Sequence, residues 1–433
     1  MELKQKIEER CARIAIVGMG YVGLPLAMEF IDAGFGVDGI EVDGAKVAAL
    51  MDGVSHIEDV GTERLGAALA SGRFRAQKNL AASGDHDIVI ICVPTPLRKT
   101  RDPDISYIRA ALDGIAGVLR PGMLVILEST TYPGTTEEIL RPQLESGGLR
   151  AGIDFHLAFS PERVDPGNAT YDTHNTPKVV GGVTGACTDV AVALYGTAVS
   201  GVVPVSGTRS AEMVKLLENT FRAVNIGLVN EIALMCDRLG IDVWEVIDAA
   251  ATKPFGFMPF YPGPGIGGHC IPLDPHYLSW KLKTLNYSAR FIELASEVNS
   301  SMPMYVVGKV TDLLNDLEKS VRGSRLLILG VTYKKGTGDV RESPAIDLIR
   351  LLRQRGAQVD YHDALVPELA IDGETLTSCS IEAGDLGKYQ CAVIVTDHPG
   401  IDYHLIMKNV PALFDARNAT RGLDPGSCLL RRL

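Results

Sequence analysis

ARIAIVGMGYVG, the stretch from Ala12 to Gly23, decides the fold of the first part of this chain. Its apolar first half is typical of a buried strand, and a GxGxxG motif follows at once. A helical pattern, LPLAMEFIDAG, comes next, and then a second short strand, VDGIEVD, which carries Glu41. A GxGxxG motif alone is a weak signal. Strand, glycine motif, helix, strand and acid in this order predict a dinucleotide-binding Rossmann unit.

The glycine motif predicts how a dinucleotide is held. Its first two glycines permit the turn and let backbone amides approach a pyrophosphate, and the third allows close packing of helix on strand. Glu41 is placed to accept hydrogen bonds from ribose hydroxyls and to repel a 2′-phosphate, which favours NAD over NADP. The alternative is a glycine-rich turn without a nucleotide. The motif residues predicted to contact the cofactor are Gly18, Gly20, Tyr21, Val22 and Gly23.

Three further strand patterns in this region end in polar loops. DIVIICVPTPL stops at Thr95, MLVILESTTYPGTT stops at Glu128, Ser129 and Thr130, and FHLAFSPER stops at Glu162 and Arg163. Ligands of open α/β sheets bind beyond the carboxyl ends of the strands, so we expect these loops to converge on the nicotinamide end of the cofactor. Any one of these polar residues could instead cap a helix.

The composition is that of a soluble globular protein: the 433 residues are 46% hydrophobic and 22% charged. A net charge of -11 argues against nucleic-acid or anionic-membrane partners. No signal-peptide pattern and no apolar run long enough for a membrane span are seen. Eight scattered cysteines without a CxxC pair indicate a reduced, cytoplasmic protein and predict no metal site.

The middle of the chain is strongly helical. The first helical stretch, from Ser210 to Gly240, carries Lys215 and Asn219 four residues apart and therefore on one face. DVWEVIDAAA and a long pattern over residues 287–318 predict further helices. A helical segment between two α/β halves often supplies a subunit interface, so we expect a homodimer or a higher homo-oligomer.

PGPGIGGHCIPLDP, residues 262–275, combines glycines and prolines around Cys270. Prolines fix the backbone, and glycines let it approach a ligand closely. A rigid loop that presents one thiol suggests covalent chemistry. The alternative is a tight turn with a buried, inert cysteine.

A second α/β pattern begins at Gly323 with GSRLLILGVTYKKG, followed by a helix that Ser343 could cap. The loop between them carries Lys334 and Arg341, which are suited to anions, although they could also be solvated surface charges. The predicted fold is α/β, with two doubly wound Rossmann-like domains joined by a central helical domain. The predicted domains are residues 1–205, which bind NAD, 206–318, which form the helical dimerisation domain with the Cys270 loop, and 319–433, which form the second Rossmann-like domain.

Seven motifs together resemble the nucleotide-sugar 6-dehydrogenases, which act on UDP-glucose, UDP-N-acetylglucosamine or UDP-N-acetylmannosamine. They are GMGYVGLPLA, CVPTPL, ESTTYPGTT, SPERVDPG, the Lys215–Asn219 helix, GGHCIPLDP and YKKGTGDVRESP, in the family's order along nearly the whole chain. The sequence KPFGFMPFYPGPGIGGHCIPLDP is most similar to the bacterial UDP-N-acetylglucosamine branch of the family, which serves polysaccharide or O-antigen synthesis.

The resemblance implies a four-electron oxidation of a sugar C6 hydroxyl to a carboxylate, with two NAD per turnover. Cys270 would attack the intermediate aldehyde and carry a thiohemiacetal and then a thioester. Lys215 and Asn219 fit a role in holding the C6 oxyanion. The resemblance also makes Asp274, Glu162 and Thr130 candidates for positioning or activating water.

The resemblance implies that residues 319–433 bind the UDP-sugar, and it assigns the binding residues as well. Lys334 and Gly267 would contact the nucleotide-sugar, together with Arg163, and Arg341 would contact the cofactor pyrophosphate. The plain UDP-glucose enzymes usually carry an arginine where this chain has Pro254, so the partner of the C6 carboxylate stays open.

Four other functions are alternatives to UDP-N-acetylglucosamine oxidation. The substrate could be UDP-glucose or UDP-N-acetylmannosamine. A β-hydroxyacid dehydrogenase would share the first Rossmann domain and the Lys and Asn, but it needs neither the cysteine nor a second α/β half. A non-catalytic nucleotide-sugar sensor would be expected to lose part of the reactive set, all of which is present.

Overall fold

A computed structural model describes residues 2–57, 59–98, 102–165, 168 and 170–433. The chain forms two compact units. The first unit is Met1–Glu218 with His276–Tyr287, and the second unit is Asn219–Pro275 with Ser288–Leu433. Two helices, α8 (Thr208–Leu239) and α10 (Asp274–Lys283), each begin in one unit and end in the other.

The elements of the first unit alternate strand and helix. In chain order they are α1 (Leu3–Glu8), β1 (Arg13–Val17), α2 (Gly23–Asp32), β2 (Gly36–Ile40), α3 (Gly44–Met51), α4 (Thr62–Ala70), β3 (Phe74–Gln77), η1 (Leu80–Ser83), β4 (Ile88–Ile91), α5 (Ser106–Ala116), β5 (Leu124–Leu127), η2 (Thr136–Leu140), α6 (Arg141–Glu145), β6 (His156–Phe159), β7 (Lys178–Gly182), α7 (Gly185–Tyr195) and β8 (Val202–Pro204).

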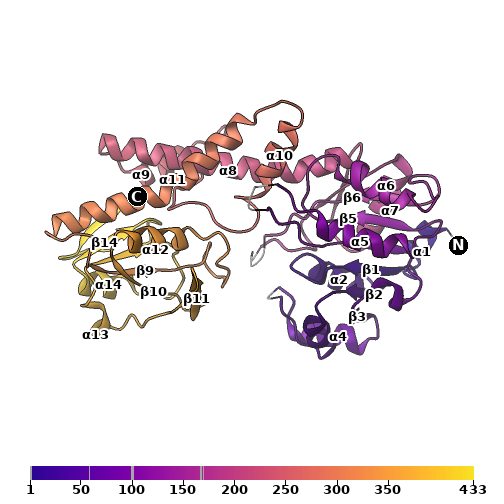
Figure 1. The fold of residues 1–433 in the computed structure, drawn as a ribbon, viewed down its shortest axis with the longest axis horizontal. Coiled ribbons are helices and arrows are strands. Elements are labelled where there is room, and N and C mark those ends of the chain that lie inside the picture. Colours follow the sequence, from indigo (N-terminus) through magenta and orange to yellow (C-terminus); the bar gives the residue numbers. More distant parts are fainter. Residues whose placement is uncertain (1, 58, 99–101, 166–167, 169) are drawn as a thin grey trace. The chain divides into compact units, whose positions relative to one another are not determined.

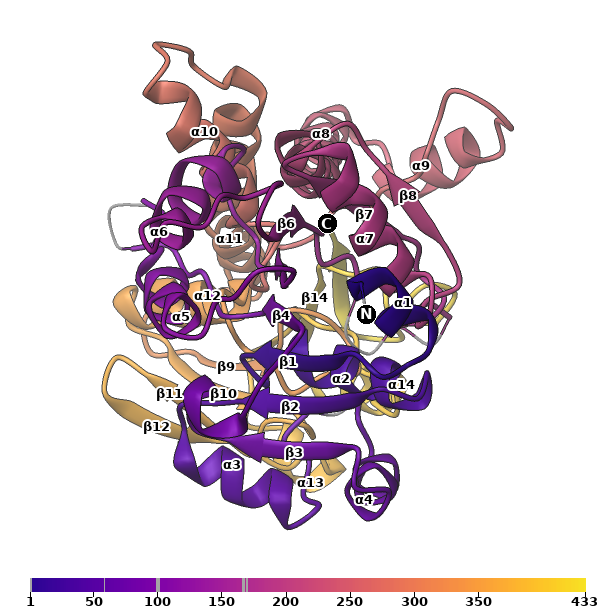
Figure 2. The same ribbon diagram turned by 90° about the vertical axis from the view of Figure 1, so that its right-hand side faces the viewer.

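The described part of the first unit has one eight-stranded sheet in the order β3-β2-β1-β4-β5-β6-β7-β8. Figure 2 shows β3, β2, β1 and β4 lying side by side in this order. All neighbours pair in parallel except β6 and β7. The order reverses between β1 and β4, and such a switch point opens a crevice at the carboxyl ends of the strands. The Gly18–Gly23 loop leaves β1 at this crevice.

Helices cover both faces of this sheet because side chains alternate along each strand. Ile14 and Ile16 of β1 pack in one core with residues of α1, α2 and α7. Ala15 of the same strand belongs to a second core with residues of α5 and α6. The sheet is therefore buried on both sides, which explains why its strands read as continuous apolar runs.

The second unit begins in helices and ends in a smaller parallel sheet. Its elements, besides the shared helices, are α9 (Val243–Ala251), α11 (Arg290–Asp316), β9 (Arg325–Leu329), α12 (Pro344–Gln354), β10 (Gln358–His362), β11 (Glu368–Ile371), β12 (Glu374–Thr377), α13 (Ala383–Leu386), β13 (Cys391–Ile394), α14 (Tyr403–Asn409), β14 (Ala412–Asp415) and β15 (Leu429–Arg432).

The sheet of the second unit has the order β10-β9-β13-β14-β15, again with a switch point, here between β9 and β13. Apolar residues of α11 and α12 pack on one face of this sheet, and α13 and α14 cover the other. Figure 1 shows α12 lying over β9 and β10. The Ser343 hydroxyl accepts a hydrogen bond from the amide of Ala345 and so caps α12, as predicted.

The predicted fold class is confirmed: two Rossmann-like parallel sheets and a central helical region. The domain boundaries stay predictions. The short strands β3, β7 and β8, the hairpin β11–β12 and the helix α10 were not predicted. α10 is the omission that matters here, because it begins at Asp274, directly after the Cys270 loop.

Candidate active site and cofactor-binding loops

The glycine loop after β1 is shaped by packing at two of its three glycines. A Cβ on Gly18, whose φ is +98°, would lie 2.6 Å from the carbonyl oxygen of Cys92, and a Cβ on Gly23 would lie 1.9 Å from the carbonyl oxygen of Gly18. A Cβ on Gly20 would meet no atom within 4 Å. Gly18 and Gly23 therefore hold the turn together, and the open side of Gly20 leaves room for a pyrophosphate at the start of α2.

The carboxylate of Glu41 stands beside this loop at the end of β2. It accepts hydrogen bonds from the amide of Met19 at 3.2 Å and from the amide of Asp43 at 3.1 Å. Tyr21 is exposed and Val22 is half-buried on the same loop. A carboxylate oriented by two amides, next to an open glycine, fits the ribose and pyrophosphate of NAD.

The loops after β4 and β5 meet, as the sequence predicts. The Thr95 hydroxyl donates to the carbonyl oxygen of Thr130 at 2.7 Å, and the Ser129 hydroxyl donates to the carbonyl oxygen of Val93 at 2.7 Å. The Tyr277 hydroxyl of α10 donates to the carbonyl oxygen of Thr95. Thr95 and Thr130 are thus held side by side at the carboxyl edge of the sheet, and their contact with a cofactor stays a prediction.

Glu162, near the start of the loop after β6, lies beside a buried ion pair. Lys178, at the first position of β7, has its Nζ 3.6 Å from Oε2 of Glu162 and bonded to Oε1 of Glu128. The Tyr195 hydroxyl donates to the other oxygen of Glu128. The side chains of Lys178 and Glu128 are 3% and 0% exposed, whereas that of Glu162 keeps 13%, so Glu162 is the member of the group that solvent reaches.

The charges in this group set their protonation states. Burial raises the pKa of Glu128 from 4.5 to about 7, against the opposing effect of Lys178. Burial acts in the same direction on Glu162, but the ammonium groups of Lys178 and Lys215 outweigh it and lower the pKa of Glu162. The two carboxylates likewise outweigh burial and raise the pKa of Lys178. At neutral pH Glu162 is therefore an ionised carboxylate, which is the form that can accept a proton.

Lys215 and Asn219 lie one helical turn apart on α8, and both side chains are buried. The Asn219 amide donates to Oδ2 of Asp274 at 2.5 Å, and the backbone amide of Asp274 donates to the carbonyl oxygen of Cys270 at 2.8 Å. Within the second unit the structure thus brings together three predicted catalytic residues, Asn219, Asp274 and Cys270. Lys215 and Glu162 come together in the first unit.

Cys270 sits in the turn that leads into α10, where the amides of Leu273 and Asp274 both donate to its carbonyl oxygen, at 3.1 and 2.8 Å. Its side chain is half-buried. The sulfur lies 3.0 Å from Nδ1 of His269. The predicted alternative of a buried, inert cysteine does not describe this environment, because the thiol is partly accessible and contacts a base.

The glycines before Cys270 pack against the loop after β9. A Cβ on Gly267 would lie 2.7 Å both from the carbonyl oxygen of Glu342 and from Cβ of Tyr333. A Cβ on Gly268 would lie 2.9 Å from the Tyr333 ring, and the Gly268 amide donates to the carbonyl oxygen of Arg341 at 2.9 Å. Glycine is required here by backbone packing, and the predicted contact of Gly267 with substrate stays a prediction.

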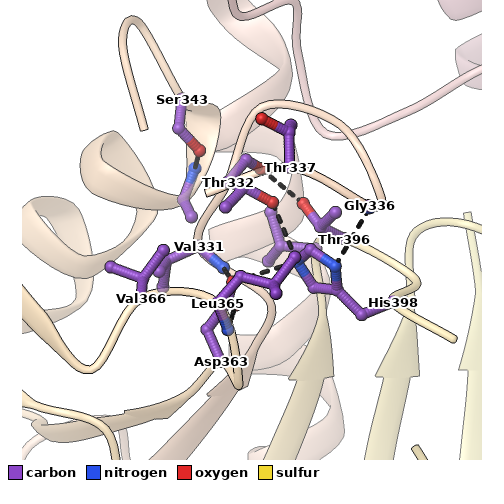
Figure 3. A network of polar contacts seen from close by, with 12 residues as sticks. Val331, Thr332, Gly336, Thr337, Ser343, Asp363, Leu365, Val366, Thr396 and His398 are labelled. Carbon is purple, nitrogen blue, oxygen red and sulfur yellow. Dashed lines mark hydrogen bonds and ion pairs between the residues drawn. The ribbon is translucent and has the colours of Figure 1, made fainter. Parts of the chain in front are cut away.

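The loop that carries Lys334 is tied to the strand ends of the second sheet (Figure 3). Nε2 of His398 lies 2.8 Å from the Thr332 hydroxyl and 3.0 Å from Oδ2 of Asp363, and the Gly336 amide donates to Nδ1 of His398. The Thr332 hydroxyl also contacts the carbonyl oxygen of Lys334 at 2.9 Å. A network of fully or nearly buried groups therefore fixes the backbone from which Lys334 projects.

Two predicted binding cations are engaged in ion pairs. Arg341 binds Asp339 through two nitrogens, at 2.5 to 3.0 Å. Arg163 binds Glu218 at 2.7 Å and donates to the carbonyl oxygen of Pro177. Both guanidinium groups are thereby oriented, and their roles toward cofactor and substrate stay predictions.

Two residues that hold parts of the site in place were not predicted from the sequence. Asn230 of α8 accepts from the Gly263 amide at 2.9 Å and donates to Asn299 of α11 at 2.8 Å, so a buried amide pair anchors the start of the Cys270 loop. Lys178 is the second such residue. The sequence signal that could have indicated both is a polar residue among apolar ones, Asn230 in a helix and Lys178 at the start of a buried strand.

Comparisons with known proteins identify the family of the chain. The chain matches the NAD-binding, central and UDP-binding domains of the UDP-glucose/GDP-mannose dehydrogenase family over residues 12–199, 209–301 and 327–422. It is 35% identical to UDP-N-acetyl-D-mannosamine dehydrogenase of Pyrococcus horikoshii over 94% of this chain and 95% of that protein. It is 36% identical to UDP-N-acetyl-D-glucosamine 6-dehydrogenase of Pseudomonas aeruginosa over 82% and 83% of the two chains.

A solved structure extends the comparison to the fold. The UDP-D-ManNAc dehydrogenase structure from Pyrococcus horikoshii superimposes with a TM-score of 0.89 at 34% identity, covering 97% of this chain and 98% of that one. Among the described residues, none of the helices is long and apolar enough to cross a membrane. The same residues contain no group of three or more His, Cys, Asp or Glu side chains that could hold a metal ion.

Proposed function

Because the chain belongs to the UDP-glucose/GDP-mannose dehydrogenase family and is an NAD-dependent UDP-sugar dehydrogenase, we propose that it oxidises the C6 hydroxyl of UDP-N-acetylglucosamine to the carboxylate. The observation that carries the covalent route is the half-buried thiol of Cys270, whose loop is bonded to Asp274 and through it to Asn219.

The reaction removes four electrons in two hydride transfers, and NAD, when bound, accepts a hydride at each. The first transfer leaves an aldehyde at C6. The Cys270 sulfur then adds to this carbon and forms a thiohemiacetal, and loss of the second hydride gives a thioester. Water cleaves the thioester, which releases the acid and restores the thiol.

The charged residues support separate steps. The ammonium of Lys215 and the amide of Asn219 hold the oxygen at C6 as negative charge develops there. Glu162, ionised beside Lys178, accepts a proton from the water that attacks the thioester. Asp274 and Thr130 orient the reacting groups, Asp274 through its bond to Asn219.

The remaining binding roles follow the charge and position of each group. Arg163, Lys334 and the backbone at Gly267 contact the nucleotide-sugar, and Arg341 contacts the cofactor pyrophosphate. Arg341 is already held by Asp339 and Lys334 projects from a fixed backbone, so neither group has to be ordered when the ligand arrives.

The choice of UDP-N-acetylglucosamine rests on the sequence around Cys270 and on the 36% identity to UDP-N-acetyl-D-glucosamine 6-dehydrogenase of Pseudomonas aeruginosa. UDP-N-acetylmannosamine is the second candidate, because the Pyrococcus horikoshii relative of that name matches at 35% over more of the chain. UDP-glucose is the third. The product would serve polysaccharide or O-antigen synthesis. The scattered cysteines without a CxxC pair support a cytoplasmic location for the reaction.

A homodimer through the helical region is part of the proposal. In the second unit α8 and α11 expose large apolar side chains, which a second copy of the chain would cover. They are Phe221, Leu228, Met235, Leu239, Phe291 and Leu294. Sedimentation of the wild type should give twice the monomer mass, and Leu228→Glu should reduce it.

The decisive experiment counts NADH formed per sugar consumed with a panel of UDP-sugars. Two NADH per UDP-N-acetylglucosamine, with a lower kcat/KM for the other sugars, is the expected result. One NADH or none with every sugar would contradict the reaction, and preference for another sugar would contradict the substrate alone. Cys270→Ala should abolish acid formation while binding of NAD and UDP-sugar persists.

A further inference from the structure

The sulfur of Cys270 contacts the side chain of its neighbour in sequence. Nδ1 of His269 lies 3.0 Å from Sγ, which is hydrogen-bonding distance for a thiol and an imidazole. The backbone is fixed on both sides of the pair. The Gly268 amide donates to the carbonyl oxygen of Arg341, and the carbonyl oxygen of Cys270 accepts hydrogen bonds from the amides of Leu273 and Asp274.

A carboxylate of the facing loop is electrostatically coupled to the imidazole. Burial acts to raise the pKa of Asp339, but Arg341 outweighs it, and the positive charge of His269 adds to the lowering of that pKa. Asp339 is held in place by Arg341. A thiol, an imidazole and a carboxylate are the groups that together activate a cysteine nucleophile, because the base takes the thiol proton and the carboxylate stabilises the imidazolium that results.

We propose that His269 is a further catalytic residue, which takes the proton from Cys270 so that the sulfur attacks the C6 aldehyde as a thiolate. This inference rests on the proposed function, since it needs an aldehyde intermediate. The charged residues of the same loop and of the facing loop after β9 are Asp274, Lys334, Lys335, Asp339, Arg341 and Glu342.

The step balances without another reagent. The S–H proton moves to Nδ1 of His269, the thiolate adds to C6, and the carbonyl electron pair becomes an oxyanion at C6. Loss of a hydride from C6 to the second NAD restores the carbonyl and gives the thioester. The proton stays on His269. When water later cleaves the thioester, the thiolate leaves beside the imidazolium, which can return this proton to it.

The test measures thiol reactivity, which needs neither substrate nor cofactor. The protein is treated with iodoacetamide in limiting amount, and alkylation of each cysteine is followed by peptide mass spectrometry. Cys11, which is exposed, is the internal reference. In His269→Gln we expect alkylation of Cys270 at pH 7 to slow by at least about tenfold, with Cys11 unchanged. His404→Gln, which removes an exposed histidine of the same unit, should leave both rates unchanged.

A second measurement on the wild type keeps the inference testable if the variant does not fold. Below its pKa an ordinary thiol loses about tenfold in alkylation rate per pH unit, because only the thiolate reacts. Cys270 should instead keep most of its rate between pH 7 and 6, where the imidazolium form holds the thiolate. A tenfold loss per unit for Cys270, or equal alkylation in His269→Gln and wild type, would overturn the role of His269. Neither result depends on the NADH count, which tests the reaction itself.

Discussion

Nζ of Lys178 lies 3.6 Å from Oε2 of Glu162, and the same ammonium group is bonded to the fully buried carboxylate of Glu128. One lysine thus serves two carboxylates, of which only Glu162 is partly exposed. The consequence is a division of roles. Glu128 and Tyr195 hold the lysine in place, and the lysine keeps Glu162 ionised.

Replacing Lys178 should therefore change the pH dependence of turnover. Lys178 lowers the pKa of Glu162, so Lys178→Met raises that pKa and the acidic limb of the kcat profile moves to higher pH. At pH 7 we expect kcat to fall by about 10- to 100-fold, because less of the base is ionised. Lys178→Arg, which keeps the charge, should recover most of the activity at low pH.

The control for this variant is a double substitution. Lys178→Met alone leaves Glu128 buried without its partner, which costs about 3–5 kcal/mol in comparable cases. Glu128→Gln together with Lys178→Met removes that charge and should restore thermal stability but not the pH profile. If the double variant had the wild-type acidic limb, Lys178 would have only a structural role.

Glu212 of α8 makes the stability of the first unit depend on pH. Its carboxylate accepts from the amides of Gly134 and Thr136 at 2.6 and 2.8 Å, yet burial raises its pKa from 4.5 to about 7. Between these values the folded chain binds a proton that the unfolded chain has lost, so stability falls as pH rises. Compared with Glu212→Gln, the wild type should lose about 3 kcal/mol of unfolding free energy across this window.

Urea unfolding at pH 4.5 and pH 8 measures this difference, and Glu63→Gln, at an exposed position of α4, is the control. If the unfolding free energies of wild type and Glu212→Gln changed equally between these two pH values, the raised pKa of Glu212 would be refuted.

Glu41 should determine the choice between NAD and NADP. Glu41→Ser removes a charged acceptor for the ribose hydroxyls and the repulsion of a 2′-phosphate. We expect the KM for NAD to rise by about 10- to 100-fold, since a hydrogen bond to a charged group contributes about 1.5–3 kcal/mol. NADP should become a measurable cofactor. Asp43→Asn, two residues away, keeps the cap of α3 and should still reject NADP. If Glu41→Ser also rejected NADP, residues other than Glu41 would determine the choice between NAD and NADP.

Gly267 should not tolerate a side chain. In Gly267→Ala the methyl group would lie 2.7 Å from the carbonyl oxygen of Glu342, so the Cys270 loop or the facing loop has to move. Overpacking of this kind costs about 1–3 kcal/mol, and displacement of Cys270 should lower kcat more than stability. Gly384→Ala, where a Cβ meets no atom within 4 Å, is the matched control. Thermal melts and NADH formation by the two variants test this directly.

Much of the fold could be predicted because both sheets are mainly parallel and buried on both faces. Such strands appear as short apolar runs separated by helical patterns, as at Ile14 to Val17 and Leu326 to Leu329. Several elements that were not predicted are short or half-exposed, such as β8 and the hairpin β11–β12. Their few residues carry little periodicity, and pairing with a neighbour decides their conformation.

The sequence by itself determined the glycine loop, Glu41, the helix with Lys215 and Asn219, and the loop of Cys270, because each depends on residue types at fixed local spacing. Only the tertiary structure showed that Lys178 joins Glu128 to Glu162, that Asn230 anchors Gly263, and that the charge of His269 acts on Asp339. These contacts join residues distant in the chain. The energies that select them, desolvation and charge pairing, depend on what is buried beside each group, which no local pattern records.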